Sequence, residues 1–368
     1  MTNDLLYQLA LTQVPHIGCV HAKLLTQHFK TAEAIFKARM ADLEKIEGIG
    51  TVRARCIKTF NQFAHAEKEI AFLEKYKIKP LFLNDAGYPQ RLLHCYDSPT
   101  LLFYRGTANL NASRIIAIIG TRSNTEYGKI VTEKLIKELE PLNILIVSGL
   151  AFGIDAIAHK TAVKYNLPTV GVLAHGLDSL YPPEHAGLAK EMVKQEGGLL
   201  TEFCSNTVAD KHNFPTRNRI VAGMSDAVVV VETGVKGGSM ITADLANGYN
   251  RDVFAFPGKT TDAKSAGCNY LIKNNKAILL TEAQELTEIM GWCAPAKKNT
   301  PKQKELFIEL NADEKAIVEI LHEKPLVHID EINLRSGLSN SSMAAAILNL
   351  ELQNVVQALP GKMYQLVP

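Results

Sequence analysis

Short apolar runs alternate with helix-like stretches between residues 115 and 256, and this alternation limits the possible folds more than any other feature of the chain. The runs occupy residues 115–119, 144–147, 169–173, 227–231 and 253–256, with helix-like stretches at 127–142, 154–166, 183–196 and 239–247. A strand that is apolar along its whole length is typical of a parallel sheet covered by helices on both faces. We therefore predict a doubly wound, Rossmann-like α/β domain over residues 76–285.

The composition is that of an ordinary globular protein, with 46% hydrophobic and 21% charged residues among 368. This excludes a disordered, collagen-like or coiled-coil chain. No apolar run approaches the roughly 18 residues of a membrane span, and the first residues lack the pattern of a signal peptide. The six cysteines form no CxxC pair, which argues against a zinc site or a disulfide framework. We expect a cytoplasmic protein without a metal, a cofactor or a membrane partner.

Residues 1–75 are predicted to form a helical domain with an internal near-repeat. The segments Val14-Pro-His-Ile-Gly18 and Ile46-Glu-Gly-Ile-Gly50 each precede a helix-like run, an order that resembles a helix-hairpin-helix or SAM-like module. Such turns place backbone N–H groups at a helix N-terminus, where a phosphate can bind. The alternative is a tight helix–helix turn that needs glycine for a positive φ. The second copy is the stronger candidate, because Arg53, Arg55 and Lys58 follow it.

The C-terminal part is predicted to contain a basic linker at residues 286–304 and a winged-helix domain at 305–368. Helices are expected at 313–322, 329–335 and 341–352, and strands at 355–359 and 363–367. Residues 305–368 carry 4 Lys and Arg against 9 Asp and Glu, whereas residues 1–75 carry 10 against 8. A polyanionic partner should therefore meet the middle of the chain and avoid the C-terminal domain.

Three familiar nucleotide and hydrolase signatures are incomplete at the predicted strand ends. Val253 replaces the first glycine of a P-loop before Gly258-Lys-Thr260, and Ile146 replaces the first glycine of GxSxG before Ser148. No GxGxxG follows the first apolar run, so a dinucleotide site is not indicated. Ligands of doubly wound sheets nevertheless bind beyond the carboxyl ends of the strands, where we place the functional residues.

A different phosphate-binding device follows the first of these runs. Gly120 permits a tight turn, Thr121, Ser123 and Thr125 supply hydroxyl groups, and the next helix offers its N-terminal N–H groups. The Arg122 guanidinium is suited to bidentate contact with a phosphate. The alternative is a buried loop in which Arg122 forms a structural ion pair.

The second candidate is the segment from Ser148 to Lys160. Ser148 and Gly149 end a strand, Asp155 is placed to cap the next helix, and Lys160 is placed to meet an anion. In the alternative interpretation, Asp155 and His159 form an i,i+4 pair that only orients the loop.

The third candidate is the stretch 213–219, which we expect to be a connector between strands. Phe214 is suited to stack on a base, while Arg217 and Arg219, with Asn218, are suited to hold a single-stranded backbone. The alternative is that the aromatic ring serves as a packing hinge.

The fourth candidate is the glycine-rich turn 232–239, which opens another helix at Gly238 and Ser239. Its position after an apolar run places this helix N-terminus at the same edge of the sheet as the other three candidates.

Together these stretches closely resemble the DNA-processing protein A family, also called DprA or Smf. The resemblance covers roughly residues 80–285 and rests on Ile118-Ile-Gly-Thr-Arg122, Tyr127-Gly128, Ser148-Gly-Leu-Ala-Phe-Gly-Ile-Asp155, Ala158-His159, Gly176-Leu-Asp178, Tyr181-Pro-Pro-Glu184, Asn213-Phe-Pro-Thr-Arg-Asn-Arg-Ile220, Gly237-Gly-Ser-Met-Ile-Thr242, Phe254-Ala-Phe-Pro-Gly258 and Gly267-Cys-Asn-Tyr-Leu-Ile272. One departure is Lys236-Gly237 before Gly238-Ser239, where the family more often has Arg/Lys-Ser-Gly-Ser.

The resemblance implies a bacterial recombination mediator that acts as a homodimer and does not hydrolyse nucleotides. It implies binding and protection of incoming single-stranded DNA in natural transformation, displacement of the single-strand-binding protein, and loading of the RecA recombinase. By position, it assigns DNA contacts to Gly120, Arg122, residues 214–219 and Lys160.

Two other classes of protein stay open on the sequence. One is a phosphoribohydrolase of related fold, although the expected PGGxGTxxE turn is absent at 232–239. The other is a transcription regulator that uses its winged helix on duplex DNA. The predicted recognition helix contains no Lys or Arg, which argues against this class.

Overall fold

The computed structural model describes residues 4–292, 310–324, 326–353, 355–359 and 362–367. The chain divides into two compact units, Met1–Trp292 and Cys293–Pro368, which are treated separately below. None of the helices in the described residues combines the length and the apolar character that a membrane span requires.

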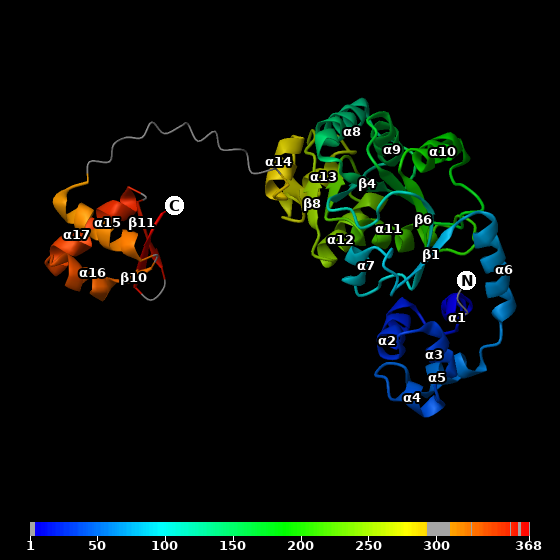
Figure 1. Cartoon of the computed structure of the whole chain (residues 1–368). Helices are drawn as coiled ribbons and strands as arrows, with labels where there is room; N and C mark the ends of the chain where they lie inside the picture. Colours follow the sequence, from blue (N-terminus) through cyan, green and yellow to red (C-terminus); the bar gives the residue numbers. More distant parts are fainter. Residues whose placement is uncertain (1–3, 293–309, 325, 354, 360–361, 368) are drawn as a thin grey trace. The chain divides into compact units, whose positions relative to one another are not determined.

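The first unit contains a nine-stranded sheet in the order β1-β2-β6-β5-β4-β3-β7-β8-β9 (Figure 1). Its strands are β1 Lys79–Phe82, β2 Leu101–Gly106, β3 Ile115–Ile119, β4 Leu145–Ser148, β5 Thr169–Val172, β6 Gly198–Thr201, β7 Ala227–Val230, β8 Asp252–Ala255 and β9 Ile278–Leu279. All pairs from β6 to β9 are parallel. The chain builds outward from β3 in one direction through β6 and in the other through β9, which confirms the doubly wound class.

Four strands of this sheet were not predicted, namely β1, β2, β6 and β9. The sheet is also not entirely parallel, because β1 pairs antiparallel with β2, and β2 pairs antiparallel with β6. The edge strands β1 and β9 contain residues that are not buried, so they lack the continuous apolar pattern that identified the central strands. Pro80 within β1 fits this edge position, because proline has no N–H to donate to a ladder.

Helices cover both faces of the sheet. These helices are α7 Gln90–Leu93, α8 Glu126–Leu139, α9 Ile154–Lys164, α10 Ala186–Lys194, α11 Asn213–Gly223, α12 Gly238–Gly248, α13 Ala266–Lys273 and α14 Ala283–Ile289, with short 3-10 turns η1 Glu140–Leu142 and η2 Pro183–His185. α14 extends into the stretch that we assigned to the linker; residues 293–304 of that stretch lie outside the described residues.

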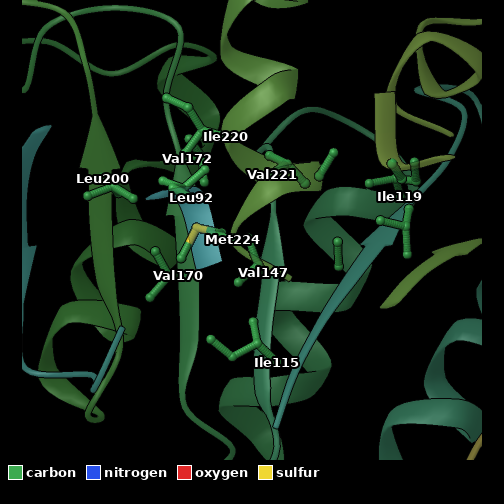
Figure 2. Packing of buried hydrophobic residues seen from close by; sticks show 14 of the residues in the cluster. Leu92, Ile115, Ile119, Val147, Val170, Val172, Leu200, Ile220, Val221 and Met224 are labelled. Carbon is green, nitrogen blue, oxygen red and sulfur yellow. The ribbon is translucent and has the colours of Figure 1, made fainter. Parts of the chain in front are cut away.

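Alternate residues of each central strand enter different cores. Ile115, Val147 and Val170 pack beneath α7, α11 and α12 in the core that Figure 2 shows from close by. Ile116 and Ile146 point to the other face and pack against α8, α9 and α14. Both faces of the central strands are therefore buried, which explains their uninterrupted apolar sequence.

The N-terminal helices form a bundle that packs on the strands β1 and β2. They are α1 Asp4–Leu11, α2 Cys19–Phe29, α3 Ala32–Lys37, α4 Met40–Glu44, α5 Gly50–Thr59 and α6 Phe63–Lys75. Their core includes Phe82, Leu101 and Phe103, from the strand positions that face away from the main core. Lys23 donates to the carbonyl oxygens of Leu93 and Cys95 at 2.6 and 2.8 Å, so its charge is used in this contact.

The two N-terminal hairpins are held together by one arginine. Arg53 donates to the carbonyl oxygens of His16 and Gly48 at 3.2 and 3.0 Å, so it bridges the first hairpin and the second. In the second hairpin Gly48 and Gly50 have φ values of +83° and +56°, whereas Gly18 of the first has a negative φ. The interpretation as a tight turn that requires glycine therefore applies to the second hairpin.

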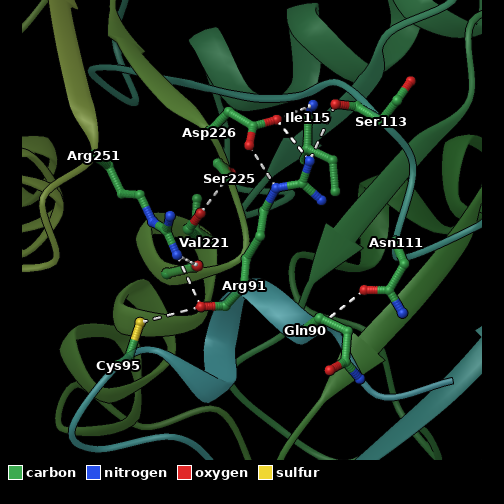
Figure 3. A network of polar contacts seen from close by, with 11 residues as sticks. Gln90, Arg91, Cys95, Asn111, Ser113, Ile115, Val221, Ser225, Asp226 and Arg251 are labelled. Atoms are coloured by element: carbon green, nitrogen blue, oxygen red, sulfur yellow. Dashed lines mark hydrogen bonds and ion pairs between the residues drawn. The ribbon is translucent and has the colours of Figure 1, made fainter. Parts of the chain in front are cut away.

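A polar network closes the sheet at the amino ends of the strands (Figure 3). Arg91 forms a bidentate ion pair with Asp226 at 2.6 and 2.9 Å, and Asp226 also accepts from the backbone N–H of Ile115. Arg251 donates to the carbonyl oxygens of Arg91 and Gly223. These contacts lie at the edge opposite the predicted functional loops and fix the start of β3 relative to β7.

The second unit has the winged-helix order that the sequence predicts. It contains α15 Ala312–Glu323, β10 Val327–His328, α16 Ile329–Ser336, α17 Asn340–Leu352, β11 Val356–Leu359 and β12 Met363–Leu366, with the strands in the order β10-β12-β11. The two-residue strand β10 was not predicted. Met343, Ile347 and Leu350 of α17 are buried in the core of this unit, so the apolar face of α17 is used internally.

Candidate nucleic-acid interface

The sheet reverses its winding direction between β3 and β7, and a cleft opens at the carboxyl ends of these strands. It has a volume of about 680 Å³ and is lined by the loops after β3, β4 and β7 and by the first turns of α11 and α12. We call it the strand-end cleft. In doubly wound sheets the reversal separates two loops that would otherwise pack together, so a crevice forms there.

Arg122 and Phe214 form one wall of the strand-end cleft. The Arg122 guanidinium carbon lies 5.0 Å from the centroid of the Phe214 ring, within the range of a cation–π contact. Arg122 is exposed and forms no ion pair with any residue that the structure describes, so the alternative of a structural ion pair does not hold. The Phe214 ring is half-buried, and the Tyr181 ring, 47% exposed, lies 6.0 Å away. This wall combines a free guanidinium with two aromatic faces.

The N-terminus of α12 forms the opposite wall. Gly237 is the N-cap residue and no side chain caps the helix. The first backbone N–H groups of a helix have no intrahelical acceptor, so those of Gly238 and Ser239 are available to an anion. Ser239 turns its hydroxyl toward Thr233 at 2.7 Å, which fixes the entry of the chain into the helix. Gly238 and Ser239 both line the cleft, as predicted.

Gly120 and Gly149 are needed for the close approach of neighbouring elements. A Cβ on Gly120 would lie 2.5 Å from the Ile154 side chain of α9, and one on Gly149 would lie 2.7 Å from the guanidinium of Arg217. Both glycines, together with Thr121, line the cleft. Their absent side chains let the strand ends pack closely against α9 and Arg217.

The N-terminus of α8 is occupied by an internal carboxylate, which corrects the prediction that it serves a phosphate. Glu232, at the end of β7, accepts hydrogen bonds from the backbone N–H and the hydroxyl of Thr125 at 2.8 and 2.7 Å. Thr125 is itself the N-cap residue of α8. The N-terminus of a helix stabilises a negative group, and here the Glu232 carboxylate is that group. The prediction failed because Glu232 is distant in sequence and reaches the loop only in the folded sheet.

Arg217 lines the cleft, but it is buried and its guanidinium is bound within the protein, which corrects its predicted role as a free phosphate contact. Its side chain is only 4% exposed and donates to the carbonyl oxygens of Gly149, at 2.6 Å, and Val172. The carboxylate of Asp155 lies beside the guanidinium, and burial raises the pKa of Asp155 while lowering that of Arg217 to about 10. The stretch 213–219 is also the start of helix α11 and not a connector. Asn218 accepts a hydrogen bond from the Arg217 Nε at 3.1 Å and lines the cleft.

Arg219 is likewise not available to DNA. It forms an ion pair with Glu202 and donates to the carbonyl oxygen of Asp97, and it does not line the cleft. Burial raises the pKa of Glu202 to about 7, although the Arg219 charge beside it acts in the opposite direction. Positions 217 and 219 lie on different sides of α11, and each side chain is covered by other elements of the fold.

Two further predicted residues do not reach the cleft. Ser148 is fully buried and donates its hydroxyl to the carbonyl oxygen of Ile118 at 2.6 Å. Lys160 is exposed on α9 but does not line the cleft.

Two histidines near the cleft are held by contacts within the protein. His159 Nδ1 bonds the hydroxyl of Thr169 at 2.7 Å, so the predicted alternative pairing of His159 with Asp155 is wrong. Burial lowers the pKa of His159 to about 3, which keeps it neutral. His175 Nε2 accepts from the backbone N–H of Tyr181. Within the described ranges, no group of three or more His, Cys, Asp and Glu side chains is placed to hold a metal.

Two residues of the cleft were given no role in the sequence analysis. Tyr181 stood within a recognised motif, and Lys211 lies two residues before the stretch 213–219; both line the cleft. An aromatic or a lysine next to a motif is common by chance, so only their place in the lining of the folded cleft identifies them. Lys211 is exposed and forms no ion pair within the part of the chain that the structure describes.

The fold and the cleft together define a Rossmann-like α/β protein with a helical N-terminal module, a winged-helix unit and a strand-end site suited to a phosphate-bearing, aromatic ligand. Residues 79–291 match the family model described as DNA recombination-mediator protein A, residues 300–362 match the DprA winged helix domain, and residues 6–70 match a helix-hairpin-helix motif. The chain therefore belongs to the DprA/Smf family, as the sequence motifs implied.

Similar proteins cover most of this chain. Protein Smf of Synechocystis is 33% identical over 98% of this chain and 98% of its own, and protein Smf of Escherichia coli is 34% identical over 80% and 79%. The solved DNA processing protein A of Streptococcus pneumoniae is 32% identical, with a TM-score of 0.66 over 78% of this chain and 98% of that one. That of Helicobacter pylori, solved to study its single-stranded DNA binding mode, is 30% identical, with a TM-score of 0.53 over 58% and 95%.

Proposed function

We propose that this chain binds single-stranded DNA in the strand-end cleft, with a backbone phosphate on Arg122 and a base on the ring of Phe214. The observation that carries the proposal is the unpaired Arg122 guanidinium held 5.0 Å from the Phe214 ring. Proteins bind single strands by pairing cations for the backbone with aromatic faces for the bases. The single-stranded DNA binding mode of the Helicobacter pylori relative supports the same ligand class here.

In this proposal both walls of the cleft contact phosphates of the DNA strand. Arg122 and Lys211 neutralise phosphates on one side, and the uncapped N-terminus of α12 at Gly238 offers its N–H groups to a phosphate on the other. Phe214 and Tyr181 supply stacking surfaces, which accept any base because every base has a π face. Binding through this cleft is therefore expected to depend on salt and to vary little with sequence.

We extend the proposal to the role that family membership implies, namely protection of incoming DNA in the cytoplasm during natural transformation, displacement of the single-strand-binding protein and loading of RecA. We also include action as a homodimer. The edge strand β9 supports this, because both of its residues, Ile278 and Leu279, are apolar and exposed. Light scattering should give twice the chain mass for the native protein and the single mass for Leu279→Lys.

The proposal includes no catalytic step. The alternative of a phosphoribohydrolase needs a free acidic group at the glycine-rich turn, but the Glu232 carboxylate is bonded to Thr125. The purified protein should bind oligonucleotides without cutting them, should not hydrolyse ATP and should not release adenine from AMP. Turnover of any of these substrates that disappears in Asp155→Asn would contradict this part of the proposal.

The test is a fluorescence anisotropy titration of labelled oligo-dT and of a duplex at several salt concentrations. Arg122→Ala should weaken binding to oligo-dT and flatten its salt dependence, because each lost phosphate contact removes one released counterion. Phe214→Ala should weaken binding by about 1–3 kcal/mol and leave the slope unchanged, because a lost stack releases no ion. Lys137→Ala, which removes an exposed cation of α8 outside the cleft, serves as the control. Equal affinity and slope in Arg122→Ala and the native protein would reject the proposed site.

A further inference from the structure

A second hollow lies next to α10, on the other side of the segment that carries Tyr181. It has a volume of about 440 Å³ and is formed by α10, the loop 177–180 and the strands β2 and β6. We call it the α10 groove. Leu180 lines this groove and the next residue, Tyr181, lines the strand-end cleft, so the two sites share one loop but no lining residue.

The floor of the α10 groove is apolar. Leu177, Leu180, Val193 and Leu199 supply it, and each belongs to a small hydrophobic cluster between α10 and the sheet. Leu177, Leu180 and Val193 are only partly buried, so their apolar surface faces the groove. A contiguous apolar surface in a hollow of this size is typical of a binding site.

The rim of the groove is cationic. Arg105 on β2 and Lys190 and Lys194 on α10 are all exposed, and none forms an ion pair with any residue in the described ranges. The two lysines are one helical turn apart and therefore lie on the same side of α10. The one carboxylate of the lining, Asp178, accepts from the backbone N–H of Asn206 at 2.9 Å. An apolar floor with a positive rim is the complement of a segment that is apolar in its centre and acidic at its ends.

Nucleic acid fits this groove poorly. The lining residues include three cations but no aromatic side chain, and single strands need an aromatic surface for their bases as well as cations for their phosphates. In the strand-end cleft both are present. The chemistry of the α10 groove therefore favours a protein ligand.

We propose that the α10 groove binds an acidic peptide segment of a partner protein, with apolar side chains of the segment on Leu177, Leu180 and Val193 and its carboxylates on Arg105, Lys190 and Lys194. The proposal goes beyond DNA binding and does not depend on it. The groove and the cleft are separate, so the chain can hold a peptide and a DNA strand at the same time.

The test selects a random peptide library, displayed on phage, on the immobilised full-length chain, and measures each enriched peptide by anisotropy. Enriched peptides should carry net negative charge and two or more apolar residues. Lys190→Glu/Lys194→Glu should weaken their binding by about tenfold or more, because it places like charges together. Ala186→Trp, which fills the groove from an exposed position without a change of charge, should also abolish binding. Lys134→Glu/Lys137→Glu on α8 makes the same change of charge at exposed positions outside the groove and should bind as the native chain does.

Three results would overturn the proposal. The first is that every enriched peptide binds the groove variants and the α8 control equally well, or that no peptide is enriched. The second is enrichment of basic or uncharged peptides. The third is that Lys190→Glu/Lys194→Glu loses affinity for oligo-dT but keeps its affinity for the peptides. This result would assign the groove to the path of DNA. Because oligo-dT binding is measured on the same variants, failure of the cleft to bind DNA remains distinguishable from failure of the groove to bind peptide.

Discussion

We expect Arg217→Ala to lower the free energy of unfolding of the first unit strongly. We expect it to change the salt dependence of oligo-dT binding little. The side chain is 4% exposed and its Nη1 donates to the carbonyl oxygens of Gly149 and Val172. Its removal leaves these acceptors without their donor and leaves the buried carboxylate of Asp155 without a neighbouring positive charge. Breaking a buried charge pair from one side costs about 3–5 kcal/mol. This is a large part of the total stability of a domain, about 5–15 kcal/mol.

The assay is urea unfolding followed by the fluorescence of Trp292. This is the single tryptophan of the chain and it packs against the core beneath α8, α9 and α14, so it reports on the first unit. Arg217→Ala should lower the midpoint strongly. The double variant Asp155→Asn/Arg217→Met should be more stable than Arg217→Ala, because it removes the stranded charge and fills the space with an apolar side chain.

The opposite pattern would refute this reasoning. If Arg217→Ala kept the native midpoint but lost oligo-dT affinity and flattened its salt dependence, Arg217 would be a phosphate contact, as the sequence first indicated. If Asp155→Asn/Arg217→Met lost as much stability as Asp155→Asn and Arg217→Met lose when measured singly and added, the charge of Asp155 would not be coupled to Arg217.

Three further outcomes are expected. Gly149→Ala should lower the unfolding midpoint, since its Cβ would lie 2.7 Å from the Arg217 guanidinium, and an unchanged midpoint would show that the arginine has room to move. Because burial lowers the pKa of His159 from 6.5 to about 3, the unfolded chain binds a proton that the folded unit excludes as the pH falls. Native stability should therefore fall by about 1 kcal/mol more between about pH 7.5 and pH 5.5 than that of His159→Asn, in urea titrations at both values. A chain that ends at Trp292 should keep most of its oligo-dT affinity, whereas residues 305–368 alone, with their excess of carboxylates, should show no binding to duplex DNA at physiological salt.

The sequence by itself identified the fold class and the loops that form the site. The apolar runs of β3, β4, β5, β7 and β8 are visible locally, because a strand covered on both faces must be apolar at every position. The glycine-rich segments after these strands are also local, and parallel strands bring their carboxyl ends to one edge. Edge strands such as β1 and the two-residue β9 stayed hidden, since their pairing depends on neighbours far away in the chain.

Only the tertiary structure decided which charged residues of these loops face a ligand. Arg122, Arg217 and Arg219 look alike in the sequence, but Arg217 meets Asp155 from α9 and Arg219 meets Glu202 beyond β6, while Arg122 meets the ring of Phe214. The burial of a charged side chain is tolerated only where a distant residue supplies the opposite charge or the hydrogen bonds. Those partners are brought by other elements of the fold, so a local pattern indicates that an arginine is present but not whether it is free to bind DNA.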